Sequence, residues 1–250
     1  MLIFLVVAAF TAGFIDSIAG GGGLISLPAL MAAGLPPHIA LGTNKLQSVF
    51  GTFFATINYA RKDKIIWKAA FVGIPLALIG SALGAKLTLF LSIGLLAKIL
   101  IFLLPPATIL MFLSNSLLKE KKIKSSFSTR RLLAVAFVCF FIGIYDGFYG
   151  PGTGTFLIVF MVLLCRMPLI NASATAKTFN LASNIGAVVT FALAGKIYYP
   201  TAIIMAVANI AGNLTGSSLA IKKGNLFIQR FVYIAILILF VYLLFNYRNY

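Results

Sequence analysis

Long apolar stretches alternate with short basic clusters along this chain. Many apolar stretches are roughly 17–22 residues long, enough to cross the hydrocarbon core of a bilayer as a helix. Two apolar stretches, Leu2–Ile15 and Leu132–Ile144, are followed by a glycine-rich segment. After it comes a shorter apolar segment, Leu24–Ala33 in the first case and Thr155–Leu164 in the second. A helix of that shorter length rises only about 15 Å, half of a bilayer core. The pattern therefore predicts two broken or re-entrant helix pairs, each with a glycine-rich tip.

Three further helices are expected after each pair. In the first half they are a helix that opens near Thr43, one at Trp67–Leu87 and one at Ile93–Leu113. In the second half they are a helix that opens near Thr175, one at Tyr199–Leu219 and one at Phe227–Phe245. The predicted fold class is an all-α integral membrane protein made of two such units.

The polar residues indicate that the two units are repeats of one another. "GFIDSIAGGGG" aligns with "GIYDGFYGPGTG", so Asp16 falls on Asp146, and "ALGTNK" aligns with "ASATAK", so Lys45 falls on Lys177. Aspartate and lysine are scarce in apolar sequence, and chance does not readily align them twice. We predict three parts, an N-terminal membrane repeat at 1–114, a basic cytoplasmic loop at 115–131 and a C-terminal membrane repeat at 132–250.

Composition supports a membrane protein. The 250 residues are 61% hydrophobic and only 10% charged, whereas about a quarter of the residues of a soluble domain are charged. The net charge of +16 sits in clusters between apolar runs, as the positive-inside rule expects of cytoplasmic flanks. We therefore expect contact with the lipid bilayer and no binding of nucleic acid.

The same clusters favour one topology. If each glycine-tipped pair returns to its starting side, the clusters at 61–68, 119–131 and 222–230 share one face, and Lys196 lies on the other. The two repeats are then inverted, and their interrupted helices meet at the repeat interface, which is a recurrent design of transporters.

The glycine tips suggest a binding site for an anion. Glycine lets the backbone turn and approach a ligand closely, and the N-terminus of the following short helix offers free N–H groups and a positive dipole end. On this argument valine at Gly22 or Gly152 blocks close approach and disfavours a positive φ. The candidate substrate-binding residues are Gly20, Gly21, Gly22, Gly23, Thr43, Asn44, Lys45, Gly150, Gly152, Thr153, Gly154, Thr175 and Lys177. Glycines elsewhere, at Gly80, Gly84, Gly212 and Gly216, are interpreted as helix-packing positions.

Half of the four acidic residues of the chain lie beside these tips. Asp63 and Glu120 belong to basic loops, but Asp16 and Asp146 fall in apolar surroundings, where a carboxylate costs roughly 2.5–3.5 kcal/mol on insertion scales. Three roles are open for this pair of acids: acceptor for the N–H groups of the glycine tips, ion-pair partner of Lys45 or Lys177, or carrier of a coupling proton.

Enzymatic and metal chemistry find little support. The single histidine, His38, and the two cysteines, Cys139 and Cys165, have no metal-ligand spacing, and no P-loop, dinucleotide or nucleophile-elbow motif occurs. We expect no catalytic residue, no metal and no cofactor.

With these motifs, Gly13–Thr52 resembles the N-terminal signature of the TauE/SafE family, also called sulfite exporters or the toluene-sulfonate uptake permease family. The strings "YDGFYGPGTGTF" and "ASATAK" resemble its C-terminal repeat. The resemblance implies a secondary carrier in the bacterial inner membrane for sulfur-containing anions such as sulfite, thiosulfate or organosulfonates. Where the first half has Gly42 and Asn44, the second has Ala174 and Ala176, so the two half-sites are not expected to be equal.

Two alternatives to an anion carrier stay open. One is a proton-linked carrier of another small ion that uses Asp16 and Asp146 directly. The other is a membrane accessory protein without flux of its own. The partners expected are a small anionic substrate and the lipid bilayer, and a homodimer is left open.

Overall fold

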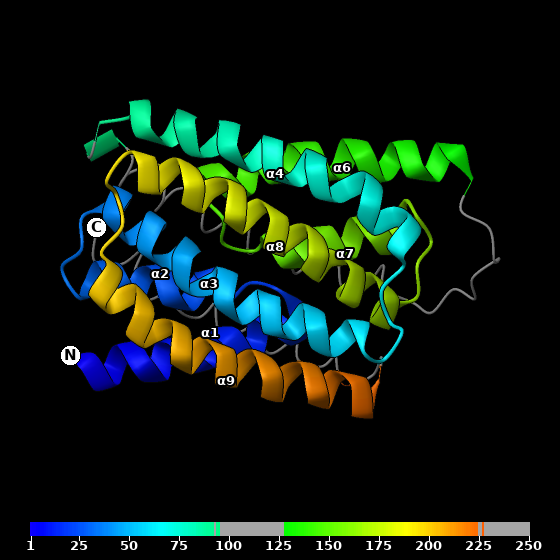
Figure 1. Cartoon of the computed structure of the whole chain (residues 1–250), viewed down its shortest axis with the longest axis horizontal. Helices are drawn as coiled ribbons and strands as arrows, with labels where there is room; N and C mark the ends of the chain where they lie inside the picture. Colours follow the sequence, from blue (N-terminus) through cyan, green and yellow to red (C-terminus); the bar gives the residue numbers. More distant parts are fainter. Residues whose placement is uncertain (93, 96–127, 225–226, 228–250) are drawn as a thin grey trace, which may run out of the picture.

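The computed structural model describes residues 1–92, 94–95, 128–224 and 227, and these form eight helices and no strand (Figure 1). The helices of the first half are α1 (Leu2–Ala19), α2 (Gly23–Ala32), α3 (Pro37–Ala60) and α4 (Trp67–Phe90). Those of the second half are α6 (Thr129–Phe148), α7 (Thr153–Leu163), α8 (Leu169–Leu193) and α9 (Tyr199–Lys223). The helices expected at Ile93–Leu113 and Phe227–Phe245, and most of the loop at 115–131, lie outside the described residues.

Helices α3 and α8 begin well before the predicted starting points, so that prediction was wrong. Pro36 and Pro37 open α3, and Pro168 is the N-cap of α8. Proline favours the start of a helix because its φ is already helical and its missing N–H would have no partner there. Thr43 and Thr175 therefore lie inside their helices rather than at the helix starts.

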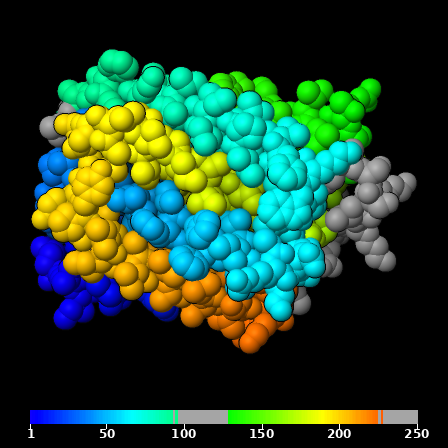
Figure 2. Space-filling view, in the orientation of Figure 1, coloured from blue at the N-terminus to red at the C-terminus, as the bar shows by residue number. Residues whose placement is uncertain are grey.

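Helices α3 and α8 lie at the centre and form a layer with α4 and α9. Figure 2 shows α4, α8, α3 and α9 side by side on one face of the molecule, in that order, and the helices are in contact. Helix α6 packs beside α4, and α1 packs beside α9, while α2 contacts α1 and α3 and α7 contacts α8. Each of α4 and α9 thus packs mainly on helices of the opposite half, which interlocks the two halves.

Small residues bring these helices close together. A Cβ atom on Gly80 or Gly84 would overlap backbone carbonyls of α6, and one on Gly212 or Gly216 would overlap backbone carbonyls of α1. Glycine permits this approach, which is how helices commonly associate in a membrane. The prediction that these four glycines are packing positions is confirmed.

The distribution of side chains is the reverse of that in a soluble protein. Large apolar side chains such as Phe71, Phe90 and Val207 are exposed on the outside, whereas many polar side chains are buried. Helices α1, α4, α6 and α9 are long and apolar enough to span a membrane. The chain is a multi-pass membrane protein.

Basic residues gather at one end of the helix bundle. In Figure 1 the α3–α4 loop, the start of α6, the α7–α8 loop and the end of α9 share one end, at the right of the view. The exposed basic residues there are Arg61, Lys62, Lys68, Arg130, Arg166, Lys222 and Lys223. At the opposite end, together with the N-terminus, lie the end of α4, which contains Lys86, and the α8–α9 loop, which contains Lys196.

Candidate functional site

Each half contains a helix break made of glycines. Between α1 and α2, Gly20 has φ +75° and Gly21 has φ +102°. Between α6 and α7, Gly150 has φ +90° and Gly152 has φ +85°. Glycine reaches these left-handed conformations without the steric cost that a Cβ atom brings. The glycines are therefore needed for the two chain reversals, which we call the glycine turns (residues 20–22 and 149–152).

The backbone conformation of Gly22 differs from the positive φ that was expected. Its φ is −53°, a helical value that any residue adopts, so the argument from positive φ does not apply at this position. The space beside it is nevertheless filled, because a Cβ atom there would lie 2.5 Å from the carbonyl oxygen of Ala12 and 2.8 Å from Cβ of Asp16. Close packing alone requires glycine here.

The first glycine turn touches the start of α7. A Cβ atom on Gly20 would overlap the backbone of Gly154 and Thr155, and one on Gly154 would lie 2.6 Å from Cα of Gly20. The hydroxyl of Thr155 donates a hydrogen bond of 2.7 Å to the carbonyl of Ala19. The start of α7 thus packs directly on the end of α1, and segments more than half the chain apart form one structure.

Two buried ion pairs flank this contact. Lys45 Nζ on α3 lies 2.7 Å from Asp146 Oδ1 on α6, and Lys177 Nζ on α8 lies 2.8 Å from Asp16 Oδ2 on α1. Each lysine therefore pairs with the aspartate of the other half. Asp16 Oδ1 also faces the backbone N–H of Gly22 at 3.5 Å. Of the three roles left open for the acids, the geometry shows ion pairing for both, with Lys177 rather than Lys45 as the partner of Asp16, and for Asp16 also the role of acceptor for a glycine-turn N–H.

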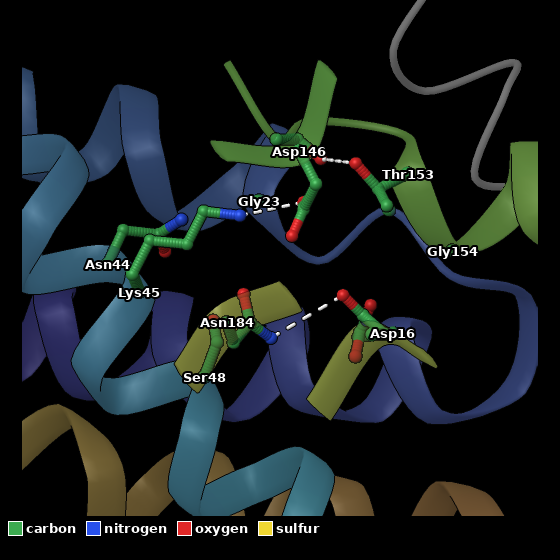
Figure 3. Close-up of a pocket in the computed structure, with 12 residues that line it drawn as sticks. Asp16, Gly23, Asn44, Lys45, Ser48, Asp146, Thr153, Gly154 and Asn184 are labelled. Carbon is green, nitrogen blue, oxygen red and sulfur yellow. Dashed lines mark hydrogen bonds and ion pairs between the residues drawn. The ribbon is translucent and has the colours of Figure 1, made fainter. Parts of the chain in front are cut away.

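A cavity lies between the turns and the ion pairs (Figure 3). Figure 3 shows Asn44 and Lys45 of α3 on one side, with Asp146 and Asp16 facing them. Every residue of its lining is glycine, polar or charged, in a chain that is 61% hydrophobic. The lining consists of Asp16, Gly21, Gly23, Asn44, Lys45, Ser48, Asp146, Gly150, Thr153, Gly154, Asn180 and Asn184.

The chain matches the family model described as Sulfite exporter TauE/SafE over residues 5–243. It belongs to the TauE/SafE family. The resemblance drawn from the glycine and lysine motifs is thereby confirmed, and the chain is a membrane transporter of this family.

Several relatives resemble this TauE/SafE transporter over nearly their whole length. "Probable membrane transporter protein YfcA" of Escherichia coli K12 is 37% identical over 95% of this chain and 87% of its own. "Probable membrane transporter protein ORF9" of a Sinorhizobium species is 37% identical over 98% of this chain and 92% of its own. A "Probable membrane transporter protein" of Haemophilus influenzae is 37% identical over 94% and 91% of the two chains. No solved structure is significantly similar to this chain.

The TauE/SafE transporter brings most of the expected site residues to the cavity. The predicted residues that do not line it are Gly20, Gly22, Thr43, Gly152, Thr175 and Lys177. Two of these link the halves, because the hydroxyl of Thr43 accepts the backbone N–H of Tyr198 at 2.9 Å and that of Thr175 accepts the N–H of Ile66 at 3.0 Å. Thr43 and Thr175 thus secure the loops that precede α9 and α4.

Three residues of the cavity lining were not predicted from the sequence. Ser48 on α3 and Asn180 and Asn184 on α8 face the cavity together with the expected residues. Ser48 stands four positions after Asn44, and Asn184 four positions after Asn180, the spacing that keeps side chains on one face of a helix. A search for polar residues at helical spacing, starting from Asn44 and the lysines, would have found them.

Proposed function

We propose that this transporter is a secondary carrier of small sulfur-containing anions, such as sulfite, thiosulfate or organosulfonates, in the bacterial inner membrane. The observation that carries the proposal is the cavity between the two glycine turns, which has a wholly polar lining and two buried lysines at or beside it. The family description, Sulfite exporter TauE/SafE, supports the class of substrate.

The two ion pairs limit how an anion can bind in the cavity. The two lysines and two aspartates carry no net charge together, so an arriving anion must replace a carboxylate beside a lysine. A carboxylate beside a bound anion repels it unless the carboxyl group is protonated or paired. Binding of the anion is then linked to uptake of a proton. Asp16 is the better placed acid, because 12% of its side chain is accessible against 2% for Asp146.

The start of each short helix faces the cavity, where the N–H and hydroxyl of Thr153 both donate to the carbonyl of Gly150. Gly23 at the start of α2, and Thr153 and Gly154 at the start of α7, are all part of the lining. Helix N-termini offer unpaired N–H groups and about half a positive charge. Two such termini directed at one cavity favour an anion over a cation.

The matched contacts support two inverted repeats with the glycine turns as their tips. The Lys45–Asp146 and Lys177–Asp16 pairs are exchanged between halves, as are the links from Thr43 and Thr175. Figure 1 shows α3 and α8 running in opposite directions through the centre. Inverted halves give a carrier two equivalent gates, one facing each side of the membrane.

This topology predicts that the basic end is cytoplasmic. A cysteine introduced at Lys62 should react with a membrane-impermeant maleimide only in inside-out vesicles, and a cysteine at Lys196 only in right-side-out cells. The native Cys139 and Cys165 are buried and serve as the unlabelled background in the unsubstituted protein. Labelling of both introduced cysteines from the same side would contradict inverted repeats.

Flux measurements test the proposed function. In liposomes the purified protein should take up sulfite saturably, thiosulfate should compete, and uptake should depend on pH. The Asp16→Asn variant should still transport but lose most of that pH dependence, whereas Asp146→Asn should keep it. Two profiles that both match the unsubstituted protein would remove proton carriage from the proposal. Absence of flux for every sulfur anion tested would favour an accessory protein.

A further inference from the structure

One side of the cavity contains a buried hydrogen-bond cluster that neither ion pair involves. Ser26 Oγ on α2 lies 2.5 Å from Asn44 Oδ1, closer than the 3.1 Å to the carbonyl oxygen of Gly22, and donates its one hydrogen to Asn44. Gln47 Nε2 on α3 donates to the same oxygen of Asn44 at 2.9 Å. The exposed fractions of Ser26, Asn44 and Gln47 are 1%, 4% and 0%. The three side chains therefore form a fixed arrangement inside the protein, of which only Asn44 lines the cavity.

The arrangement determines which way the Asn44 amide faces. Two donors converge on Oδ1, so the Nδ2 group points away from them. It lies 3.6 Å from the position that a Cβ atom on Gly23 would occupy, and Gly23 also lines the cavity. Figure 3 shows the Asn44 side chain on this side of the cavity, close to Lys45 and Gly23. The amide thus presents N–H donors where the start of α2 presents its own.

The opposite orientation of the amides is less favourable. In the observed one, Gln47 Oε1 is the atom of this cluster that has no hydrogen-bond partner. If the amides of Asn44 and Gln47 were both reversed, the unpaired group would be the NH2 of Gln47, with two donors. Unpaired buried N–H groups are rarer in proteins than under-satisfied carbonyl oxygens. The donors on Asn44 are therefore the groups offered to a ligand.

We propose that Asn44 donates a hydrogen bond to an oxygen of the transported anion, and that Ser26 and Gln47 are positioning residues that keep its amide in the donating orientation. This inference rests on the proposed function and specifies its site. Lys45, the next residue, supplies charge, whereas Asn44 supplies a neutral donor of fixed direction. The ligand chemistry that fits is an oxyanion with at least two acceptor oxygens, one for each side chain.

The second half has no equivalent cluster. The positions aligned with Asn44 and Gln47 are Ala176 and Phe179. On that side Ser183 donates to Asp146 at 2.6 Å, and the amides that line the cavity, Asn180 and Asn184, bond to one another at 3.4 Å. The cluster of Ser26, Asn44 and Gln47 is therefore a feature of the first half.

The variant Gln47→Glu tests the orientation directly. As a carboxylate, Glu can only accept, so the Asn44 amide should reverse and present Oδ1 to the anion. As a neutral acid at low pH, Glu donates again and should restore the native orientation. Because burial favours the neutral acid, we expect the KM for sulfite in liposomes to rise at least tenfold over the unsubstituted protein only at alkaline pH, where the carboxylate forms, and this ratio to shrink as the pH falls.

Two further variants keep the test decisive if Gln47→Glu does not fold. Ser26→Ala removes one donor to Oδ1 and should raise the KM for sulfite several-fold with little change in the maximal rate. Asn44→Asp keeps the acceptor for Ser26 but replaces the donor by an anionic oxygen, and should abolish uptake. The matched control is Ser81→Ala, a buried serine that donates to the carbonyl of Ser183 outside the cavity lining; its KM should stay unchanged.

The results separate this inference from the proposed function. If the unsubstituted protein transports sulfite and the Ser26 and Asn44 variants transport it with unchanged KM, the Asn44 inference is wrong and the proposed function stands. A ratio for Gln47→Glu that does not vary with pH would also overturn the inference. If the unsubstituted protein transports no sulfur anion at all, the proposed function itself fails.

Discussion

Lys177→Met is expected to abolish transport and to lower the free energy of unfolding by about 3–5 kcal/mol, the usual cost of removing one partner of a buried ion pair. The substitution leaves the Asp16 carboxylate without a cation, in a site where its partner side chain is 1% exposed. Methionine keeps the length and apolar volume of lysine, so the loss reports on the charge. Unfolding in mixed detergent micelles, measured beside sulfite flux, gives both quantities.

A comparison of two double variants identifies which lysine pairs with Asp16. Lys177→Met with Asp16→Asn removes a complete pair and should recover most of the stability, although transport stays lost. Lys45→Met with Asp16→Asn breaks both pairs and should be at least as unstable as either single variant. Equal recovery in the two double variants would mean that the pairs are not exchanged between halves as described.

Gly20→Ala is also expected to have a large effect, since it acts on the contact between the first glycine turn and the start of α7. The added Cβ atom faces the backbone of Gly154 and Thr155, which cannot rotate away. A left-handed conformation costs a residue with Cβ about 1–2 kcal/mol, and overpacking typically adds about 1–3 kcal/mol. We expect loss of transport and a free energy of unfolding lowered by about 2–5 kcal/mol.

Gly34→Ala is the matched control for this substitution. Gly34 also has a positive φ, +91°, but nothing lies within 4 Å of the position of its Cβ atom. It should therefore show only the conformational cost of about 1–2 kcal/mol and keep its transport. If Gly20→Ala were no more harmful than Gly34→Ala, the contact between the first glycine turn and α7 would not be tightly packed.

Those residues of the site that stand out within a short stretch of sequence were predictable. Asp16, Lys45, Asp146 and Lys177 were singled out because charged residues are costly in apolar segments and therefore seldom occur there without a role. The glycine turns were recognisable for a similar reason, since consecutive glycines would weaken an uninterrupted helix. Residues of ordinary type, such as Asn180 and Asn184, carried no comparable signal and were missed.

From the residues alone it follows that the chain is helical and lies in a membrane, where its helices break, and which charged residues are costly to bury. Apolar length, glycine runs and rare charges are properties of single continuous segments, so they can be recognised without knowing the fold. That Lys177 pairs with Asp16 and Lys45 with Asp146, and that Thr43 and Thr175 hold loops instead of lining the cavity, follows only from the folded arrangement. These outcomes depend on α4 and α9 packing on the opposite half, and such packing is the sum of many weak contacts between segments distant in sequence.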